Sequence, residues 1–443
     1  MISFSPLQLR RLTRRAGPPR TEATRPARSA GRLLAGPADR DALKAWAGTR
    51  AAVLLLGFGV AAGLSSSAAI PGFGQQWAHW DAVLLARIAR FGYRGNPAQP
   101  QDKGLPAFFP GEPLLLRLVH AVVPDWTVAG VVLSFLAGAV AVVALARLAG
   151  RGQDFQQNGA GGAATADAAA QAGGVAARAG RYAVWGLLLA PPAVFLFAGY
   201  TEPVFLAFAI PAWLLALRRQ WSGAALAAAG ASVVRINGLF LAVALVVEFL
   251  VARRGQAVPK RSEALPDTDG APAAAAPETR WRSAGWLVLP FVPVVLYAVY
   301  QWGRTGDILA WQHAQQDGWQ RHLVSPVSSF ITTWNAAFHT SDVFTWAFRA
   351  ELAGAAAGVA LALWLAWRRR WGELTYVGLA VVALLSSTYY LSVPREALLW
   401  WPLWTGLGRT AARRPLVFVV YAMLAAPLMA AYVVTFTRGA WAG

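Results

Sequence analysis

The sequence contains no cysteine among its 443 residues. This absence excludes a disulfide framework and a thiolate-bound metal site, although it says little about the cell compartment. Charged residues are also scarce, at 14% of the chain, whereas a soluble domain usually carries about 25%. Together with a hydrophobic share of 56%, this scarcity argues against a soluble enzyme.

Two familiar signatures of enzyme sites are missing as well. The chain has no Gly-x-x-x-x-Gly-Lys-Ser/Thr loop for nucleotide phosphates and no His-Glu-x-x-His pair for zinc. No apolar core that would suit a cleavable signal precedes Ala51, and we find no internal repeat. The connections between apolar runs are too short for a cytoplasmic nucleotide-binding domain.

Acidic residues are outnumbered, with 21 Asp and Glu against 40 Lys and Arg, which gives a net charge of +19. Nucleic-acid binding is one explanation of such a basic chain. Here, however, the basic residues are spread over the connections between apolar runs, as the positive-inside rule for membrane proteins describes. We therefore expect a membrane bilayer as the partner, and no nucleic acid.

Long apolar runs, nearly free of charge, dominate the chain, for example residues 185–199, 283–302 and 416–436. Several of the 21 Trp lie where such runs end, as in the aromatic belt at a membrane interface. The sequence predicts an all-α, polytopic bundle of about ten or eleven membrane segments, placed in a bacterial plasma membrane.

The arginines predict how the chain is threaded. Residues 1–48 are basic and rich in Pro and Ala, and we expect them to form a disordered cytoplasmic tail before a single transmembrane domain at 49–443. The apolar stretches 222–234 and 238–252 are too short to cross comfortably, which predicts a hairpin whose tip is Arg235-Ile236-Asn237.

The same reasoning assigns the connections to two sides. Basic linkers at 148–181 and 253–282 are predicted to be cytoplasmic, which makes 71–126 and 303–344 outer loops. The short run Leu114–Val123 is interrupted by polar residues and is predicted not to cross. All candidate site residues then fall on the outer face.

Ionisable groups in or beside a membrane are costly and are therefore candidates for function. Asp81 is placed to act as a base on a hydroxyl, or alternatively as a helix N-cap. Glu202 begins a returning span, where it either complements the helix dipole or contacts a sugar. Arg235 suits a lipid phosphate, or a structural pair with an acid from another span.

Aromatic and polar residues near these groups complete the candidate site. Phe109 either lines a lipid or sugar groove or anchors a Pro-rich turn at the interface. His313 is either a ligand contact or an ordinary loop histidine. Arg395 is either a ligand contact or is simply neutralised by the adjacent Glu396. The remaining candidates are Trp80, Tyr93, Tyr200, Asn237, Gln312 and Trp319.

Seven short segments carry a family resemblance. They are Trp80-Asp81 with Ile88-Ala89 and Gly92-Tyr93; Ala107-Phe108-Phe109-Pro110; Pro113-Leu114-Leu115-Leu116-Arg117; Tyr200-Thr201-Glu202; Arg235-Ile236-Asn237-Gly238; Trp311-Gln312-His313; and Ser392-Val393-Pro394-Arg395. In this order, over about residues 77 to 405, they resemble the PIG-V-type mannosyltransferases of the GT-C class of multispan glycosyltransferases. The chain departs from that family at Ala82-Val83-Leu84 and at Glu112, which leads us to expect a different acceptor or sugar.

The resemblance implies GT-C-like outer loops and a transferase that moves mannose from a polyprenyl-phosphate donor to an extracytoplasmic acceptor with inversion. Asp81 would be the base, and Arg235 or Arg395 would stabilise the leaving phosphate. Asn237, Glu202 and Tyr200 would also contact the donor. The groove or acceptor would be contacted by Trp80, Tyr93, Phe109, Gln312, His313 and Trp319.

The resemblance implies no cofactor, and the sequence shows no cluster of metal ligands. A lipid flippase or secondary transporter is the main alternative, because it would use the same intramembrane charges without a base. Transporters often contain paired repeats with broken helices at matching positions, however, and this chain offers only the break at Arg235. An assembly scaffold is a third interpretation. The acceptor and the oligomeric state are not predicted.

Overall fold

The computed structural model describes residues 36–64, 72–100, 102–151, 166–257, 279–341 and 344–440. Within these ranges the regular structure consists of α-helices and short 3-10 helices, and no strand is present. One isolated antiparallel bridge joins Leu323 to Ser387. From Pro37 onwards the chain forms one compact unit, and the following account concerns that unit.

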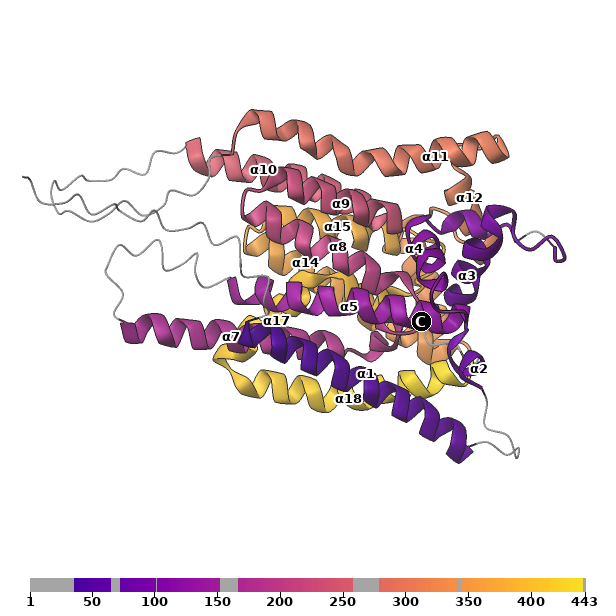
Figure 1. Cartoon of the computed structure of the whole chain (residues 1–443), viewed down its shortest axis with the longest axis horizontal. Helices are drawn as coiled ribbons and strands as arrows, with labels where there is room; N and C mark the ends of the chain where they lie inside the picture. The colour runs from indigo at the N-terminus through magenta and orange to yellow at the C-terminus, as the bar shows by residue number, and fades with distance from the viewer. Residues whose placement is uncertain are drawn as a thin grey trace, which may run out of the picture. The chain divides into compact units, whose positions relative to one another are not determined.

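Long helices run side by side through the unit, as Figure 1 shows. In chain order they are α1 (Pro37–Leu64), α5 (Trp126–Gly150), α7 (Ala166–Leu188), α8 (Thr201–Leu217), α9 (Trp221–Val234), α10 (Asn237–Ala257), η5 (Trp281–Phe291) continued by α11 (Val292–Thr305), α14 (Thr345–Trp367), α15 (Trp371–Leu385), α17 (Trp401–Arg413) and α18 (Pro415–Thr437).

Short helices are found between the long ones, and α2, α3, α4 and α12 gather at one end of the bundle, on the right in Figure 1. The short elements are α2 (Phe73–Trp77), α3 (Asp81–Phe91), η1 (Gly92–Arg94), η2 (Leu105–Ala107), α4 (Gly111–His120), η4 (Pro191–Leu196), α12 (Ala310–Trp319), α13 (Pro326–Phe338), α16 (Val393–Glu396) and η6 (Ala397–Leu399).

The helices have the composition of a membrane protein. Among the described residues, five helical stretches are long and apolar enough to cross a membrane: 37–60, 126–150, 281–305, 345–367 and 415–437. Three shorter helices, α8, α9 and α15, are also apolar. The expected all-α class and membrane character are therefore confirmed, while the count of ten or eleven membrane segments stays a prediction.

Large apolar side chains remain exposed on the outermost helices. On α18, Leu416, Met423 and Leu424 are each more than 60% exposed, and on α11 Leu296 is 62% exposed. A water-soluble protein rarely leaves contiguous apolar surface of this kind uncovered. We infer that lipid covers these faces.

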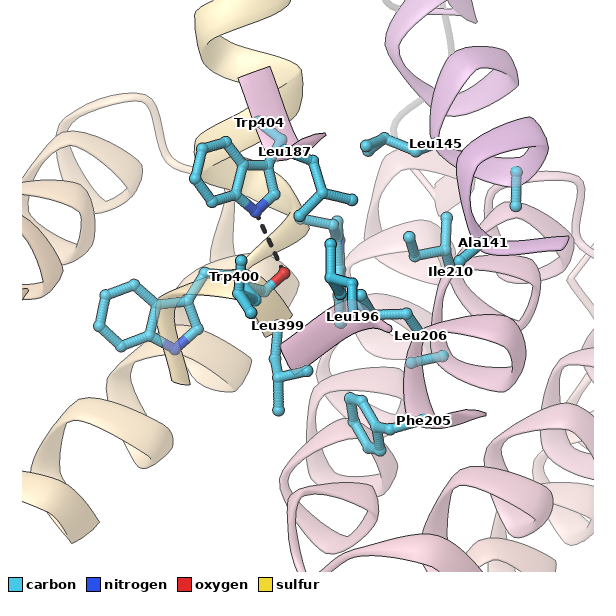
Figure 2. Close-up of a cluster of buried hydrophobic side chains, with 14 of the residues drawn as sticks. Ala141, Leu145, Leu187, Leu196, Phe205, Leu206, Ile210, Leu399, Trp400 and Trp404 are labelled. Atoms are coloured by element: carbon cyan, nitrogen blue, oxygen red, sulfur yellow. Dashed lines mark hydrogen bonds between the residues drawn. The ribbon is translucent and has the colours of Figure 1, made fainter. Parts of the chain in front are cut away.

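A core of apolar side chains surrounds α8. Figure 2 shows the part where Leu206 and Ile210 of α8 lie near Leu196 and Leu399, and all four side chains are buried. Small residues allow some helices to approach closely, as is common in membrane bundles. A Cβ atom added at Gly408 of α17 would lie only 2.4 Å from the carbonyl oxygen of Ala179 in α7.

The prediction that residues 1–48 form a disordered tail is wrong for residues 37–48. Helix α1 begins at Pro37, and the Trp46 ring is buried against Gly138 of α5, where an added Cβ would lie 2.2 Å from that ring. Arg147 Nη2 also pairs with Asp39 Oδ2 at 2.7 Å. Interspersed charged residues hid this buried face from a search for apolar runs. Residues 1–35 lie outside the described residues.

Both predicted cytoplasmic linkers are shorter than expected. Helix α7 begins at Ala166, so residues 166–181 are helical rather than part of a linker, and α10 continues to Ala257. Helix α10 therefore has 21 residues and is not the short stretch expected, whereas α9 has 14. Pro191 and Pro192 follow α7 in η4, because proline cannot continue an α-helix.

The two predicted outer loops contain the short helices α2, α3 and α4, and α12 and α13, respectively. Helix α4 spans ten residues, Gly111–His120, which is about 15 Å at 1.5 Å per residue. This length is too short for a hydrocarbon core of about 30 Å. The short run at 114–123 therefore cannot cross as a helix, while the side on which these segments lie stays a prediction.

Candidate active site

A cavity of about 430 Å³ lies at the end of the bundle that carries the short helices. This volume falls within the usual range for small-molecule sites, about 300–1,000 Å³. The lining comes from distant parts of the chain, including α3, the break between α9 and α10, α12 and α16. Seven of the twelve predicted site residues line it: Asp81, Phe109, Arg235, Asn237, Gln312, Trp319 and Arg395.

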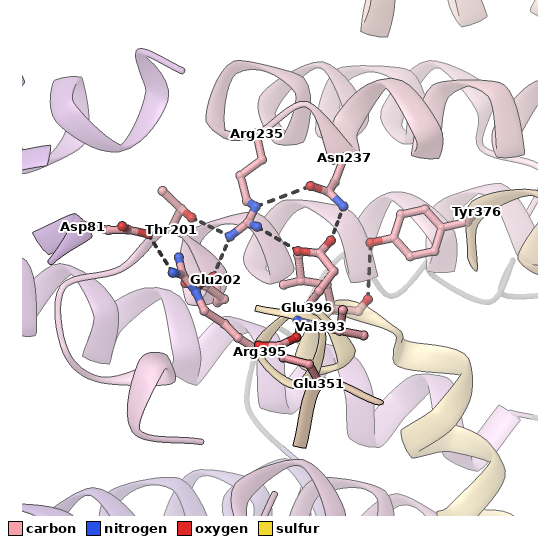
Figure 3. A network of polar contacts seen from close by, with 11 residues as sticks. Asp81, Thr201, Glu202, Arg235, Asn237, Glu351, Tyr376, Val393, Arg395 and Glu396 are labelled. Atoms are coloured by element: carbon pink, nitrogen blue, oxygen red, sulfur yellow. Dashed lines mark hydrogen bonds and ion pairs between the residues drawn. The ribbon is translucent and has the colours of Figure 1, made fainter. Parts of the chain in front are cut away.

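Five charged side chains form one alternating cluster beside this cavity, drawn in Figure 3. Arg395 Nη1 pairs with Asp81 Oδ2 at 2.6 Å, and Arg395 Nε pairs with Glu202 Oε1 at 2.5 Å. Arg235 Nη1 pairs with the same Glu202 oxygen at 2.6 Å. Arg235 Nη2 then pairs with Glu396 Oε2 at 2.8 Å. The cluster thus contains three carboxylates and two guanidinium groups.

Arg235 is also held by neutral partners. Its Nη1 donates to Thr201 Oγ1 at 2.8 Å, and its Nε donates to Asn237 Oδ1 at 3.4 Å. The Asn237 amide in turn donates to Glu396. Every side-chain nitrogen of Arg235 therefore has a partner, and the geometry is that of a structural pair with acids from other segments. Contact with a phosphate, the other interpretation, stays a prediction.

Asp81 is the first residue of α3, and Trp80 occupies the N-cap position without a side-chain capping bond. The interpretation of Asp81 as an N-cap is therefore wrong, because its carboxylate is directed to Arg395 instead. Trp80 has a φ of 51°, in the left-handed region, at the turn that leads into α3. Asp81 Oδ1 accepts no hydrogen bond from the described residues.

Arg395 and Glu396 are positioned by a buried acid from α14. Glu351 accepts hydrogen bonds from the backbone nitrogens of Ser392 and Val393, each at 2.7 Å. Ser392 has a φ of 61° just before α16, a strained conformation for a residue with a side chain. The two bonds from Glu351 offset that strain and hold α16 in place.

Glu202 and Tyr200 begin α8 after a turn at Gly199, whose φ of 74° favours glycine. Glu202 is fully buried, so its charge needs the paired arginines. The Tyr200 hydroxyl donates to the His79 carbonyl oxygen at 3.1 Å, and its ring lies 4.6 Å from the Arg395 guanidinium. Tyr200 therefore packs against Arg395 of the charged cluster and does not line the cavity.

The charge state of Arg395 follows from its surroundings. Burial alone would lower the pKa of the Arg395 guanidinium, but the carboxylates of Glu202 and Asp81 outweigh it and raise that pKa above its ordinary value. Arg395 therefore remains a cation at any physiological pH. A permanent cation fixes the orientation of the Asp81 carboxylate.

The walls of the cavity combine aromatic rings with amides. Phe108 and Trp319 meet edge to face with ring centroids 5.6 Å apart, and both line the cavity. The side chains of Gln312 and Gln315 add hydrogen-bonding groups to the same wall. Aromatic faces beside a few convergent polar groups are typical of sites for small-molecule ligands.

Besides Glu202 and Tyr200, three further predicted residues do not line the cavity. Trp80 is 42% exposed and Tyr93 is buried in a separate cluster, where its hydroxyl donates to the Phe108 carbonyl oxygen at 2.8 Å. His313 is exposed, and its Nδ1 lies 2.6 Å from Asp307 Oδ2. Tyr93 thus supports the cavity wall. His313 lies on helix α12 and not in a loop, and it does not line the cavity.

The sequence reasoning did not identify several residues of the site. Glu351 was detectable, because it is an isolated acid within an apolar run, which is costly in a membrane. Glu396 was assigned to neutralise its neighbour Arg395, but its partners are Arg235 and Asn237. Arg321 also lines the cavity, and no motif pointed to it.

Glu112, where the chain departs from the family pattern, does not line the cavity. It is fully buried, and neither of its carboxylate oxygens has a hydrogen-bond partner among the described residues. Burial and the neighbouring Glu202 carboxylate raise the pKa of Glu112 well above its usual range. Its position gives it no direct contact with a ligand in the cavity.

Within the described part of the chain, no group of three or more His, Cys, Asp or Glu side chains could hold a metal ion. Asp81 and Glu202 each use one carboxylate oxygen to accept from Arg395. This pair therefore acts as the anionic partner of an arginine here.

Comparison of the chain with protein-family models, with curated proteins and with solved structures gave no match. The family resemblance therefore rests on the seven short segments quoted above, and it stays a prediction.

Proposed function

We propose that this protein is an integral membrane glycosyltransferase that moves mannose from a lipid-phosphate donor to a hydroxyl group of an acceptor. The observation that carries the proposal is the state of Asp81: Oδ2 is fixed by Arg395, while Oδ1 has no hydrogen-bond partner among the described residues at the cavity. A held carboxylate with one available oxygen has the geometry required of a general base.

The reaction requires one displacement. The acceptor hydroxyl gives its proton to Asp81 as its oxygen attacks the anomeric carbon of the sugar. A new carbon–oxygen bond forms while the bond between the anomeric carbon and the phosphate oxygen breaks, and the electron pair leaves with the phosphate. Attack from the opposite side inverts the anomeric centre. Phosphate is a good leaving group, so a strong general acid is not needed.

The location of the cavity supports a lipid-linked substrate. The cavity lies at one end of an apolar helical bundle, where a polar head would be held while its hydrocarbon chain stays in the membrane. Aromatic rings and glutamine side chains suit the apolar faces and hydroxyl groups of a hexose. A donor of this kind also requires no nucleotide site.

Direct measurement of transfer tests the proposal. Protein purified in detergent is given a prenyl-phosphate-linked mannose labelled in the sugar, together with a panel of hydroxyl acceptors, and labelled product is separated from donor. A flippase or transporter would instead move the intact lipid-linked molecule across a vesicle membrane without releasing prenyl phosphate. Unchanged donor in every assay, with movement across vesicles, would contradict the enzyme and favour the transporter.

We predict that the end of the bundle with the cavity faces outward. The opposite end carries Arg368-Arg369-Arg370 between α14 and α15, and positive residues favour the cytoplasmic side. Because the chain is free of cysteine, single substitutions report location directly. Gln99→Cys at the cavity end should react with a membrane-impermeant maleimide in intact cells. Arg369→Cys should react only after lysis, and the reverse pattern would invert the topology.

A further inference from the structure

The two arginines expected to bind the donor phosphate are already neutralised. Arg235 and Arg395 are paired with three carboxylates, Asp81, Glu202 and Glu396, at 2.5–2.8 Å. An arriving phosphate would meet a cluster whose formal charge is negative, and it would have to displace an existing ion pair. Breaking a buried ion pair is strongly unfavourable, so this cluster is a poor receptor for an anion.

Arg321 differs from both of them. It lines the same cavity, and its Nε donates to the Ser387 hydroxyl at 2.8 Å. In the ranges that the structure describes, it has no carboxylate partner, and its two terminal nitrogens make no hydrogen bond. Neither terminal nitrogen is fully enclosed by protein atoms. Both are therefore accessible to a ligand.

The burial of Arg321 makes the missing partner significant. Desolvation lowers the pKa of the Arg321 guanidinium. The more distant Tyr389, Glu351 and Glu396 act in the opposite direction but do not outweigh it. A partly buried cation without an adjacent acid is costly. An anion bound beside it would recover the lost electrostatic stabilisation, whereas the paired Arg235 has little to gain.

The backbone around Arg321 is held by contacts from two directions. Helix α12 ends at Trp319, the next residue has a φ of 55°, and the Arg321 nitrogen donates to the Gln315 carbonyl oxygen at 3.2 Å. The following residues pair with the segment after α15 through Val324 N to Ser386 O, at 2.9 Å, and through the bridge between Leu323 and Ser387. The guanidinium is thus preorganised, which reduces the entropy lost on binding.

We propose that Arg321 is the phosphate-binding residue of this cavity, and that it receives the phosphate of a prenyl-phosphate ligand. The planar guanidinium offers its two terminal nitrogens for a bidentate contact with phosphate oxygens. The Trp319 ring and the Gln315 amide line the cavity with it. In a bound donor, the sugar would lie between Arg321 and Asp81. The assignment deepens the proposed function and rests on it for the identity of the anion.

Binding measurements test this assignment without any need for transfer. A short prenyl phosphate is titrated into the purified full-length protein in detergent by calorimetry, alongside the matching prenyl alcohol and inorganic phosphate. We expect the prenyl phosphate to bind the parent, and Arg321→Gln to raise its Kd by about 10- to 100-fold, the usual scale for hydrogen bonds to a charged group. Binding of the alcohol should not change.

Three further variants make the result specific. Arg321→Lys keeps the positive charge but loses the bidentate contact that a planar guanidinium makes with phosphate. The Kd of this variant should therefore lie between those of the parent and Arg321→Gln. The exposed Arg94, which does not line the cavity, gives the matched control Arg94→Gln, and its Kd should equal that of the parent. If Arg235→Gln weakens binding while Arg321→Gln does not, the phosphate lies at the cluster and the assignment is overturned.

The remaining outcomes separate this assignment from the proposed function. Inorganic phosphate that competes with prenyl phosphate in the parent, but not in Arg321→Gln, supports the assignment and identifies the headgroup as the ligand. Failure of both phosphates to bind the parent overturns it. Binding that depends on Arg321, without transfer in any assay, leaves the assignment standing and contradicts the glycosyltransferase.

Discussion

Asp81→Asn should lower the turnover of glycosyl transfer by about 100-fold or more, the usual scale for the loss of a general base. Asparagine has nearly the same shape, and its side-chain oxygen can still accept from Arg395, so the fold and the cavity should be preserved. It cannot take a proton from the acceptor. The measurement compares initial rates of transfer from a prenyl-phosphate-linked mannose, parent against variant, in detergent.

The matched control removes a carboxylate at the same end of the bundle. Asp307 is partly exposed, bonds His313 and does not line the cavity, so Asp307→Asn should leave the rate within a factor of about two. Prenyl-phosphate binding by Asp81→Asn should stay close to that of the parent, because Asp81 is not assigned to the phosphate. Equal turnover for the parent and Asp81→Asn would remove Asp81 from the mechanism.

Much of the helical framework could be predicted from the sequence, because long apolar runs with few charges have few alternatives to a membrane helix. The apolar run at 416–436 lies within α18, and the predicted tip at Arg235-Ile236-Asn237 falls where α9 ends and α10 begins. The beginning of α1, residues 37–48, could not be found in this way. Charged residues alternate there with Ala42 and Trp46, and only packing against α5 buries its apolar face.

The candidate site was predictable in part, for a physical reason. Ionisable residues between apolar runs are rare, so Asp81, Glu202 and Arg395 stood out, and the structure brings all three together. Which acid pairs with which base was not predictable. Glu396 is next to Arg395 in sequence but reaches Arg235, because α16 turns its side chain toward the break between α9 and α10.

Arg321 illustrates what local sequence cannot contain. Its position depends on pairing between the segment after α12 and the segment after α15, about 65 residues later in the chain. No periodic pattern of apolar residues and no sequence motif indicates such a pairing, because each segment alone resembles an ordinary loop. Residues that act through long-range backbone contacts are therefore the ones that sequence reasoning missed.

Glu202→Gln should cause the largest loss of stability of any single substitution in the charged cluster. One oxygen of this fully buried side chain accepts from both Arg235 and Arg395. Glutamine has the same shape, but it removes the charge that two buried cations share. Breaking a buried pair by removing one partner typically costs about 3–5 kcal/mol. The measurement is the free energy of unfolding of the purified protein in mixed detergent micelles.

A double substitution separates charge from packing. In Glu202→Gln with Arg395→Gln, the pair between Arg235 and Glu396 survives, and Asp81 alone loses its partner. Asp81 is less deeply buried than Glu202, so the double variant should be more stable than the sum of the two single losses predicts. For residues in direct contact, this coupling is usually about 0.5–3 kcal/mol.

The control for the loss of a carboxylate is Asp125→Asn. Asp125 caps α5 through Val128 N at an exposed position, and asparagine caps equally well, so this change should cost less than about 0.5 kcal/mol. If Glu202→Gln costs no more than Asp125→Asn, or if its loss simply adds to that of Arg395→Gln, the two arginines do not depend on Glu202. The Asp81 carboxylate would then not be held by a coupled cluster, and the argument for its fixed orientation would fail.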